Sequence, residues 1–322
     1  MPPISVNPRN VDNVSKKESI NVKPSDNKKA KIDFELSEPL YSMEDLILPE
    51  ITKSELDRAI SLRHFQKEVF EDWGFSQTHK FDNKMIINLY GEPGTGKTMA
   101  AHAIAKSLNK KIILINYGDI ESKYVGETPK NIKAAFDYAK NNNAVLFFDE
   151  ADAILSKRVT NMTSATDTSV NQTRSVMLTL LNDYNDTVLF ATNFISNYDS
   201  AFMRRILMHI EFTLPDELTR RQLFDKYIPK LLPHSFLLDE LVSESKGLSG
   251  SDISNAVLLS AFSAKTANRD LVSQDDLLSK IANIKKSKKH NSNTNLTTEK
   301  TEISKKIVSE NYVNRQLKIG EK

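Results

Sequence analysis

A glycine-rich turn limits how this chain can fold more than any other stretch of its sequence. The turn has the sequence GEPGTGKT and covers residues 91–98. The apolar run KMIINLY stands directly before it, and a helix-like run follows at residues 98–108. A buried strand that passes through a tight glycine turn into a helix is the start of a βαβ unit. The turn therefore predicts a parallel sheet with helices packed on it.

Strands and helices continue to alternate after this turn. Further short apolar runs follow at residues 111–117, 144–150, 187–193 and 208–214, and helical patterns lie between them at 129–141 and 170–184. All-apolar strands separated by helices are typical of a parallel sheet that is covered on both faces. The predicted fold class is α/β, with a doubly wound parallel sheet.

Changes in composition divide the chain into four parts. Residues 1–33 are rich in Asn, Ser, Lys and Pro without apolar periodicity, which predicts a disordered basic N-terminal arm. A large α/β domain then covers residues 34–214 and opens with an amphipathic helix at 54–75. After it only helical patterns occur, so residues 215–285 should form a small helical domain. Residues 286–322 are expected to be a basic linker with a possible C-terminal helix.

Composition excludes several kinds of site. The chain has no cysteine, which rules out disulfides, zinc–thiolate sites and a thiol nucleophile. No run is long and apolar enough for a membrane span, and the N-terminus lacks the apolar core of a signal peptide. We therefore expect a soluble, cytoplasmic protein with no membrane partner.

Basic residues gather at the two ends of the chain. Residues 1–32 hold seven Lys and Arg against three Asp and Glu, and residues 281–322 hold ten against four, although the net charge of the whole chain is only +2. Such tails could contact nucleic acid or an acidic partner. We favour solvated tails, because neither has a structured basic face with interleaved aromatic residues and the middle of the chain is acidic. Nucleic acid is therefore not the expected partner.

The spacing Gly91-x4-Gly96-Lys97-Thr98 matches a phosphate-binding loop in its required place between a strand and a helix. Glycines let backbone N–H groups approach phosphate oxygens, and the N-terminus of the helix favours negative charge. Lys97 would add a full charge near the β- and γ-phosphates, and the Thr98 hydroxyl could bind Mg²⁺. The alternative is an ordinary Gly/Pro turn. The predicted nucleotide-binding stretch is Gly91, Glu92, Pro93, Gly94, Thr95, Gly96, Lys97, Thr98 and Met99.

Polar residues also end two of the predicted strands. Asp149 and Glu150 close an apolar strand, and strand ends of a doubly wound sheet open on the same crevice as the phosphate loop. Asp149 would hold Mg²⁺, and Glu150 would orient or deprotonate the attacking water. A helix N-cap is the alternative for this pair. Asn193 could hydrogen-bond the γ-phosphate or the water, although Asn is also common in turns after strands.

The order of the motifs resembles one known family. GEPGTGKT, KYVGET, LFFDEAD, FATN, DSAFMRRI and LPDELTRR are followed by GLSGSDI in a helical region. Over residues 45–284 this series looks like an AAA ATPase module, a P-loop NTPase with a small C-terminal α-helical lid domain. It resembles the katanin, spastin and FtsH group, and most of all the stand-alone bacterial members. The resemblance implies ATP and Mg²⁺ as cofactors and ATP hydrolysis as the reaction.

The resemblance also implies catalytic roles. Glu150 would act in hydrolysis, and Asn193 would sense the γ-phosphate. Arg204 and Arg205 would be arginine fingers that complete the site of a neighbouring subunit, where a guanidinium stabilises charge on the transferred phosphoryl group. An isoleucine follows them where many relatives have phenylalanine, so the register between the two arginines stays open. Asn116 matches the position that holds the glutamate in an inactive pose.

The remaining assignments concern the polypeptide substrate and the base of the nucleotide. By the resemblance, the pore loop of Lys123, Tyr124 and Val125 would face the centre of a ring, where an aromatic side chain grips polypeptide without specific hydrogen bonds. Packing of Tyr124 against the following helix is the alternative. The adenine pocket would use Leu46, Ile47, Gly250 and Ser251. GLSGSDI carries no lid arginine, and no HExxH motif is present, so no zinc protease is fused to this chain.

The expected function is Mg-dependent ATP hydrolysis by a ring of identical subunits, expected to be a hexamer, that remodels, unfolds or disassembles protein substrates. An adaptor or a partner effector protein could supply recognition. Two alternatives stay open: an ATP-controlled assembly switch that acts on a partner complex without threading, and a nucleic-acid motor.

Overall fold

The computed structural model describes residues 34–79, 84–116, 127–156, 165–193 and 198–290. Every described residue belongs to one unit, which lies within residues 34–322. The predicted pore loop, residues 123–125, lies outside the described residues.

This unit is built on a six-stranded sheet with the order β1-β3-β4-β5-β2-β6. Neighbouring strands from β3 to β6 pair in parallel, which confirms the predicted α/β class. β1 pairs antiparallel with β3 at the edge and was not predicted, because two residues are too few to show a strand period. The strands are β1 (Leu36–Ser37), β2 (Met85–Gly91), β3 (Ile112–Asn116), β4 (Val145–Asp149), β5 (Thr187–Thr192) and β6 (Met208–Phe212).

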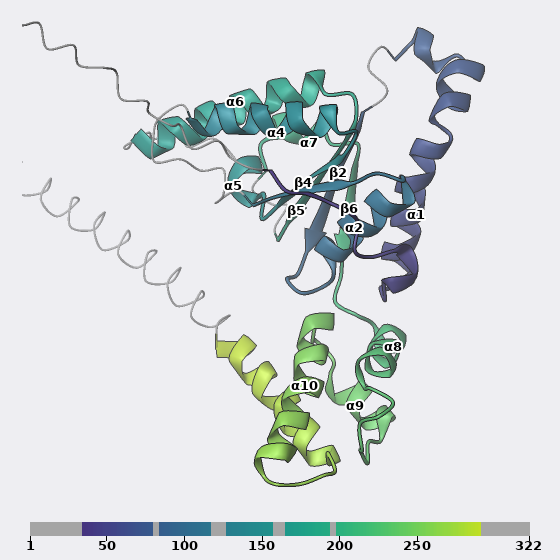
Figure 1. Ribbon diagram of the computed structural model, residues 1–322, viewed down its shortest axis with the longest axis vertical. Helices are drawn as coiled ribbons and strands as arrows, with labels where there is room; N and C mark the ends of the chain where they lie inside the picture. Colours follow the sequence, from purple (N-terminus) through teal and green to yellow (C-terminus); the bar gives the residue numbers. More distant parts are fainter. Residues whose placement is uncertain (1–33, 80–83, 117–126, 157–164, 194–197, 291–322) are drawn as a thin grey trace, which may run out of the picture. The chain divides into compact units, whose positions relative to one another are not determined.

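Helices cover both faces of the sheet (Figure 1). α1 (Glu50–His64) and α2 (Lys97–Ser107) pack on one face, and α4 (Glu127–Asn141) and α6 (Ala165–Asp183) lie together on the other. Two helices consist of a single turn. α5 (Asp152–Leu155) follows β4, and α7 (Ser200–Met203) precedes β6.

Alternate side chains of the central strands enter two separate hydrophobic layers. In β4, Phe147 belongs to the core cluster that contains residues of α1 and α2. Its neighbour Phe148 points the other way, with its ring 5.4 Å from that of Phe190 and 5.9 Å from that of Phe136 in α4. Both phenylalanines are fully buried, as a strand covered on two faces requires. This double burial explains why the strands appear as continuous apolar runs in the sequence.

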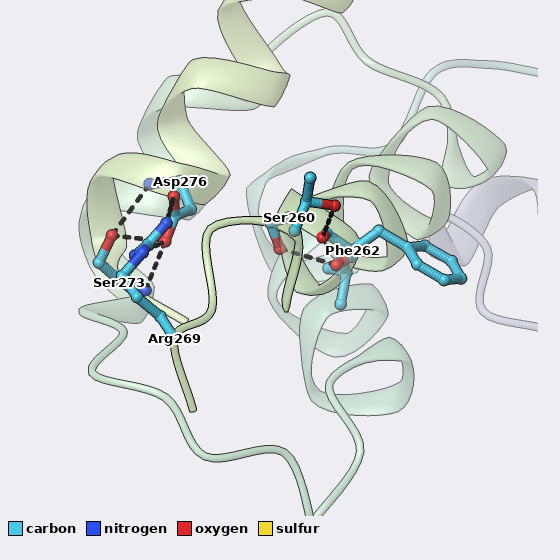
Figure 2. A network of polar contacts seen from close by, with 7 residues as sticks. Ser260, Phe262, Arg269, Ser273 and Asp276 are labelled. Atoms are coloured by element: carbon cyan, nitrogen blue, oxygen red, sulfur yellow. Dashed lines mark hydrogen bonds and ion pairs between the residues drawn. The ribbon is translucent and has the colours of Figure 1, made fainter. Parts of the chain in front are cut away.

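Beyond the sheet the chain is helical, with α8 (Glu217–Tyr227), α9 (Leu238–Glu244), α10 (Gly250–Thr266) and a further helix at residues 274–290. These helices bury a core of their own around Phe224, Leu241 and Ile253. Figure 2 shows how the last of them begins: Asp276 accepts a hydrogen bond from the Ser273 backbone N–H at 2.9 Å and forms an ion pair with Arg269. Helical structure continues to residue 290, the last described residue in this part of the chain.

The amphipathic helix predicted over residues 54–75 has different limits. α1 begins at Glu50 and ends at His64, and a short π-helical turn (Glu68–Asp72) and two 3₁₀ turns, Met43–Asp45 and Phe75–Gln77, flank it. Its core-facing residues Leu56, Ala59 and Ile60 are buried, whereas Trp73 is 67% exposed. The apolar spacing in the sequence therefore extends beyond the end of α1, to residues that have no core to pack on.

Candidate nucleotide site

The backbone of residues 91–98 adopts a conformation that needs glycine. Gly91, Gly94 and Gly96 have φ angles of 138°, 76° and 103°, a region that other residues rarely adopt. A Cβ atom on Gly91 would also lie 2.2 Å from the Phe212 backbone oxygen in the neighbouring strand β6. The loop can therefore leave β2 at this point only because residue 91 lacks a side chain.

Lys97 lies at the centre of the loop and is 9% exposed. Its Nζ donates to the backbone oxygens of Gly91 and Glu92 at 2.7 and 3.0 Å, and to Oδ1 of Asn193 at 3.2 Å. Burial lowers the pKa of Lys97, and the carboxylates of Asp149, Asp152 and Glu92 oppose that shift. The ammonium group is thus held where the phosphate loop meets the ends of β4 and β5.

Thr98 and Asp149 bring two oxygen ligands together, because the Thr98 hydroxyl donates to Oδ2 of Asp149 at 2.9 Å. Oxygen is the ligand that Mg²⁺ prefers, and proteins commonly hold this ion with one or two side chains while phosphates and water complete the octahedron. The described residues contain no group of three or more acidic, His or Cys side chains that could hold a metal alone. The pair therefore fits Mg²⁺ that arrives with a nucleotide.

Glu150 follows Asp149 in a strained backbone conformation. Its φ is +50°, its side chain is exposed, and its N–H donates to Oδ1 of Asp149 at 2.9 Å. Non-glycine residues at positive φ are uncommon and gather at functional sites. The turn directs the chain away from β4 immediately after the Asp149 carboxylate, so the two acidic side chains occupy different positions.

β5 lies between β2 and β4, so its end lies between the end of the strand before the phosphate loop and the end of the strand that carries Asp149. Asn193 follows that end, and its side chain already contacts Lys97. On the other side of β4, Asn116 ends β3 and is the register partner of Asp149. Its side chain is exposed, and no hydrogen bond joins it to Glu150 in the described part of the chain. The structure thus brings the loop, both acidic residues and both asparagines to one edge of the sheet.

Asp152 is a residue at this edge that the sequence prediction did not include. Both of its carboxylate oxygens accept the Asn193 backbone N–H, at 3.3 and 3.2 Å. The signal was present in the sequence, because FFDEAD places a third acidic residue one helical turn after Asp149. Acidic residues at the start of a helix are common, however, and the pattern alone does not distinguish one that reaches the next strand.

The predicted adenine-pocket residues lie at the helical region and at the segment before α1. The Ser251 N–H donates to the Gly94 backbone oxygen at 3.1 Å, and a Cβ on Gly250 would lie 3.6 Å from the same oxygen. Leu46 is 5% exposed within the core beneath the sheet, whereas Ile47 packs against the core around Phe224. Leu48 was not among the residues predicted for this pocket. One of its side-chain carbons lies 3.7 Å from the position that a Cβ on Gly96 would occupy.

The two predicted finger residues differ in their surroundings. Arg205 is tied to its own chain, because Nε donates to Asn182 Oδ1 at 2.8 Å and Nη1 donates to the Ala201 backbone oxygen at 2.6 Å. Arg204 is exposed, and no hydrogen bond or ion pair joins its side chain to another residue in the described ranges. Within one copy of the chain, Arg204 is therefore the arginine that is free to reach elsewhere.

Residues 87–214 match the family model described as "ATPase family associated with various cellular activities (AAA)". This range begins within β2, contains the loop, both acidic residues, Asn193 and both arginines, and ends just after β6. The chain contains an AAA ATPase module. The predicted resemblance to that family is confirmed.

Curated relatives extend the match beyond the AAA module. The 26S proteasome subunit RPT4 of Saccharomyces cerevisiae is 32% identical over 243 residues, which cover 72% of this chain and 54% of that protein. A proteasome-activating nucleotidase of Saccharolobus islandicus is 33% identical over 238 residues, or 71% and 59% of the two chains. The 26S proteasome regulatory subunit 4 homolog B of Arabidopsis thaliana is 34% identical over 223 residues, or 67% and 49%. The chain thus spans about half the length of the relatives it matches.

No helix in the described part of the chain is both long enough and apolar enough to cross a membrane.

Proposed function

We propose that this chain binds and hydrolyses ATP with Mg²⁺ at the edge of the sheet where β2, β4 and β5 end. The observation that carries the proposal is the pair of contacts Lys97–Asn193 and Thr98–Asp149, which join the phosphate loop to the two neighbouring strand ends. Mg²⁺ bound there would neutralise charge on the phosphates. Glu150 would take the proton of the attacking water.

In this proposal Lys97 and Asn193 act as a positioned pair. Lys97 is held by two backbone oxygens of its own loop, which keep its charge at the phosphate position, and no carboxylate among the described residues forms an ion pair with it. The Asn193 amide contacts Lys97 through its oxygen and so keeps its NH₂ group available as a donor. Donors fixed in advance at the place where charge develops are the main source of rate enhancement in phosphoryl transfer.

We further propose that copies of the chain assemble into a ring in which Arg204 completes the site of the neighbouring copy. The support is the contrast between Arg204, which is exposed, and Arg205, which is bound to Asn182 and Ala201 of its own chain. Arg205 would hold the short segment that presents Arg204. An arginine supplied in trans raises phosphoryl-transfer rates by ~10³–10⁵.

Protein chains are the substrate class that we propose. The names of the relatives connect them with the proteasome, and the AAA module is what this chain shares with them. We propose that hydrolysis unfolds or remodels a polypeptide that the ring grips through Tyr124, with an adaptor or effector protein as a further partner.

The test measures ATP hydrolysis and unfolding together. The substrate is a fluorescent protein with an unstructured tail, and loss of fluorescence reports unfolding. Lys97→Ala should abolish both activities, because the loop loses its charge at the phosphates. Tyr124→Ala should keep most of the ATPase activity and lose unfolding, since the residue acts on the substrate alone. Tyr124→Phe, which keeps the ring, is the matched control and should unfold the substrate.

Two results would count against this function. Unfolding by Tyr124→Ala at the wild-type rate would mean that Tyr124 does not grip the substrate. Glu150→Gln should lose hydrolysis and keep ATP binding. If this variant still acted on the substrate as the wild type does, the result would favour an assembly switch that needs only bound nucleotide.

A further inference from the structure

We infer that Asp152 is a positioning residue for hydrolysis and that it acts by fixing the backbone of Asn193. The inference rests on the proposed ATPase function, because Asn193 is the residue that would meet the γ-phosphate. Asp152 does not itself contact the loop residues 91–98 through any hydrogen bond found among the described residues. Its carboxylate also acts electrostatically on the pKa of Lys97, but the hydrogen bonds that join it to the site go to the Asn193 backbone.

The geometry of Asp152 suits this role. It is the first residue of α5, the single turn that starts two residues after Glu150. Its two carboxylate oxygens accept one donor, the Asn193 N–H, at 3.3 and 3.2 Å. Immediately before it, the Ala151 N–H donates to the Ala191 backbone oxygen at 2.9 Å. The start of α5 is thus attached to the end of β5 at two successive places.

Asn193 needs such an attachment because the sheet ends before it. The last register pair of β5 with β2 is Tyr90 with Thr192, and β5 pairs with β4 only up to Phe190. Asn193 therefore has no register partner of its own in β2 or β4. A carboxylate that accepts a backbone N–H forms a charge-assisted hydrogen bond, about twice as strong as a neutral one. Asp152 replaces the missing strand partner at the one position where orientation matters for the proposed reaction.

The other end of α5 holds the chain that follows Asn193. The Leu155 backbone oxygen accepts the Asp199 N–H at 2.9 Å, and Ser156 forms an antiparallel bridge with Tyr198. Tyr198 is 6% exposed and reaches Asn88 and Thr192 on the strands beneath. Because α5 is fixed at both ends, its Asp152 carboxylate is a rigid support rather than a mobile surface group.

The test is a comparison of Asp152→Ala with Asn193→Ala and with the double variant. ATP turnover is measured at saturating ATP, and ATP affinity is measured separately by binding of a fluorescent ATP analogue. Asp152→Ala should lower kcat about 10–100-fold, since small displacements of a positioning group have effects of that size. The Kd for the analogue should stay close to the wild-type value. The double variant should be no slower than Asn193→Ala, because residues that act as one unit are not additive.

Asp152→Asn tests the same contact with one acceptor oxygen and no charge, and its kcat should fall between those of the wild type and Asp152→Ala. It also decides the question if Asp152→Ala does not fold. Asp276→Ala is the matched control, because it removes another carboxylate that accepts a backbone N–H, at the start of helix 274–290 (Figure 2). That control should lose thermal stability and keep its kcat.

Several outcomes would overturn the inference. A wild-type kcat in Asp152→Asn, or a double variant slower than Asn193→Ala by the full factor of Asp152→Ala, would show that Asp152 does not act through Asn193. A parallel loss of kcat in Asp276→Ala would show that lost stability explains the effect. If Asn193→Ala is slow but Asp152→Ala is not, the ATPase proposal survives and only this inference fails; an inactive wild type would remove both.

Discussion

At the scale of single residues, the phosphate loop depends on a glycine that two separate constraints require. Gly91 has a φ of +138°, and a Cβ there would lie 2.2 Å from the Phe212 oxygen and 2.9 Å from its carbonyl carbon. Both atoms belong to the backbone of β6, which cannot rotate away as a side chain could. We expect Gly91→Ala to bind ATP poorly and to unfold more easily than the wild type.

Gly247→Ala is the matched control for that variant. Gly247 has a φ of +87° but no atom within 4 Å of a built Cβ. It should lose only the ~1–2 kcal/mol that left-handed backbone requires of a non-glycine residue. Gly91→Ala should lose a further ~1–3 kcal/mol from the steric conflict, which urea unfolding can measure. Equal losses would contradict the reading that β6 constrains the loop.

Tyr198 supplies a second prediction at this scale, in the alkaline range. Burial raises its pKa from 10.0 to about 12 in the folded state. Between these values the folded chain keeps a proton that the unfolded chain has released, so the free energy of unfolding falls as pH rises. The contribution of Tyr198 to the free energy of unfolding is fully present below pH 10. By about pH 11 roughly 1 kcal/mol of it is lost.

The measurement is the slope of the free energy of unfolding against pH for the wild type and Tyr198→Phe. The Phe variant should show a shallower decline above about pH 10, because it has no hydroxyl to ionise. Burial also raises the pKa of Tyr184, so part of the decline should remain. Identical slopes would mean that the Tyr198 hydroxyl is not protected in the folded state.

At the scale of elements, the single turn α7 lies between β5 and the exposed Arg204. Asp199 caps it by accepting the Ala201 N–H at 2.9 Å, and Arg204 is its C-terminal cap residue. Removing such an N-cap destabilises a helix by ~1 kcal/mol. Asp199→Ala should therefore lower the ATPase rate, because the turn no longer holds Arg204 in one orientation. Asp199→Asn keeps a capping acceptor and should retain most of the rate. An unchanged ATPase rate in Asp199→Ala would mean that the structure of α7 does not affect ATP hydrolysis.

The sequence predicted the elements that are buried on both sides and missed those that are not. The five parallel strands appeared as apolar runs because β4 and its neighbours carry core residues on both faces. β1 was missed because its two residues are only half-buried and its pairing with β3 joins segments far apart in the sequence. The end of α1 was missed because Phe65 and Trp73 continue the helical spacing although both remain exposed. Periodicity indicates a face that could be buried, and only the tertiary contacts decide whether it is.

The site was predicted in the same uneven way. Thr98 donates a hydrogen bond to Asp149 and Lys97 donates one to Asn193, so the loop meets the two strand ends that the spacing led us to expect. Asp152 was not predicted, because its partner is a backbone N–H on another strand and no spacing rule reports that pairing. The difference between Arg204 and Arg205 depends on Asn182 of α6, which also could not be read from the sequence.

At the scale of the whole molecule, the account makes hydrolysis a property of an assembly. One copy holds the phosphate loop, the Thr98–Asp149 pair proposed for Mg²⁺ and the proposed sensor Asn193, while the exposed Arg204 contacts no partner in the described ranges of that copy. If Arg204 serves a neighbour, the ATPase rate per subunit should rise with protein concentration. Arg204→Ala should lower that rate far more than Arg205→Gln, in which the amide can still hydrogen-bond to Asn182 or Ala201.

The most direct test of this claim mixes two inactive variants. Glu150→Gln lacks hydrolysis at its own site but keeps its arginine, whereas Arg204→Ala keeps its site but has no arginine to offer. The two are combined at low concentration and then concentrated so that mixed assemblies form. The account predicts that the mixture hydrolyses ATP although neither variant does so alone. An inactive mixture, or an Arg204→Ala variant that is fully active alone, would contradict it.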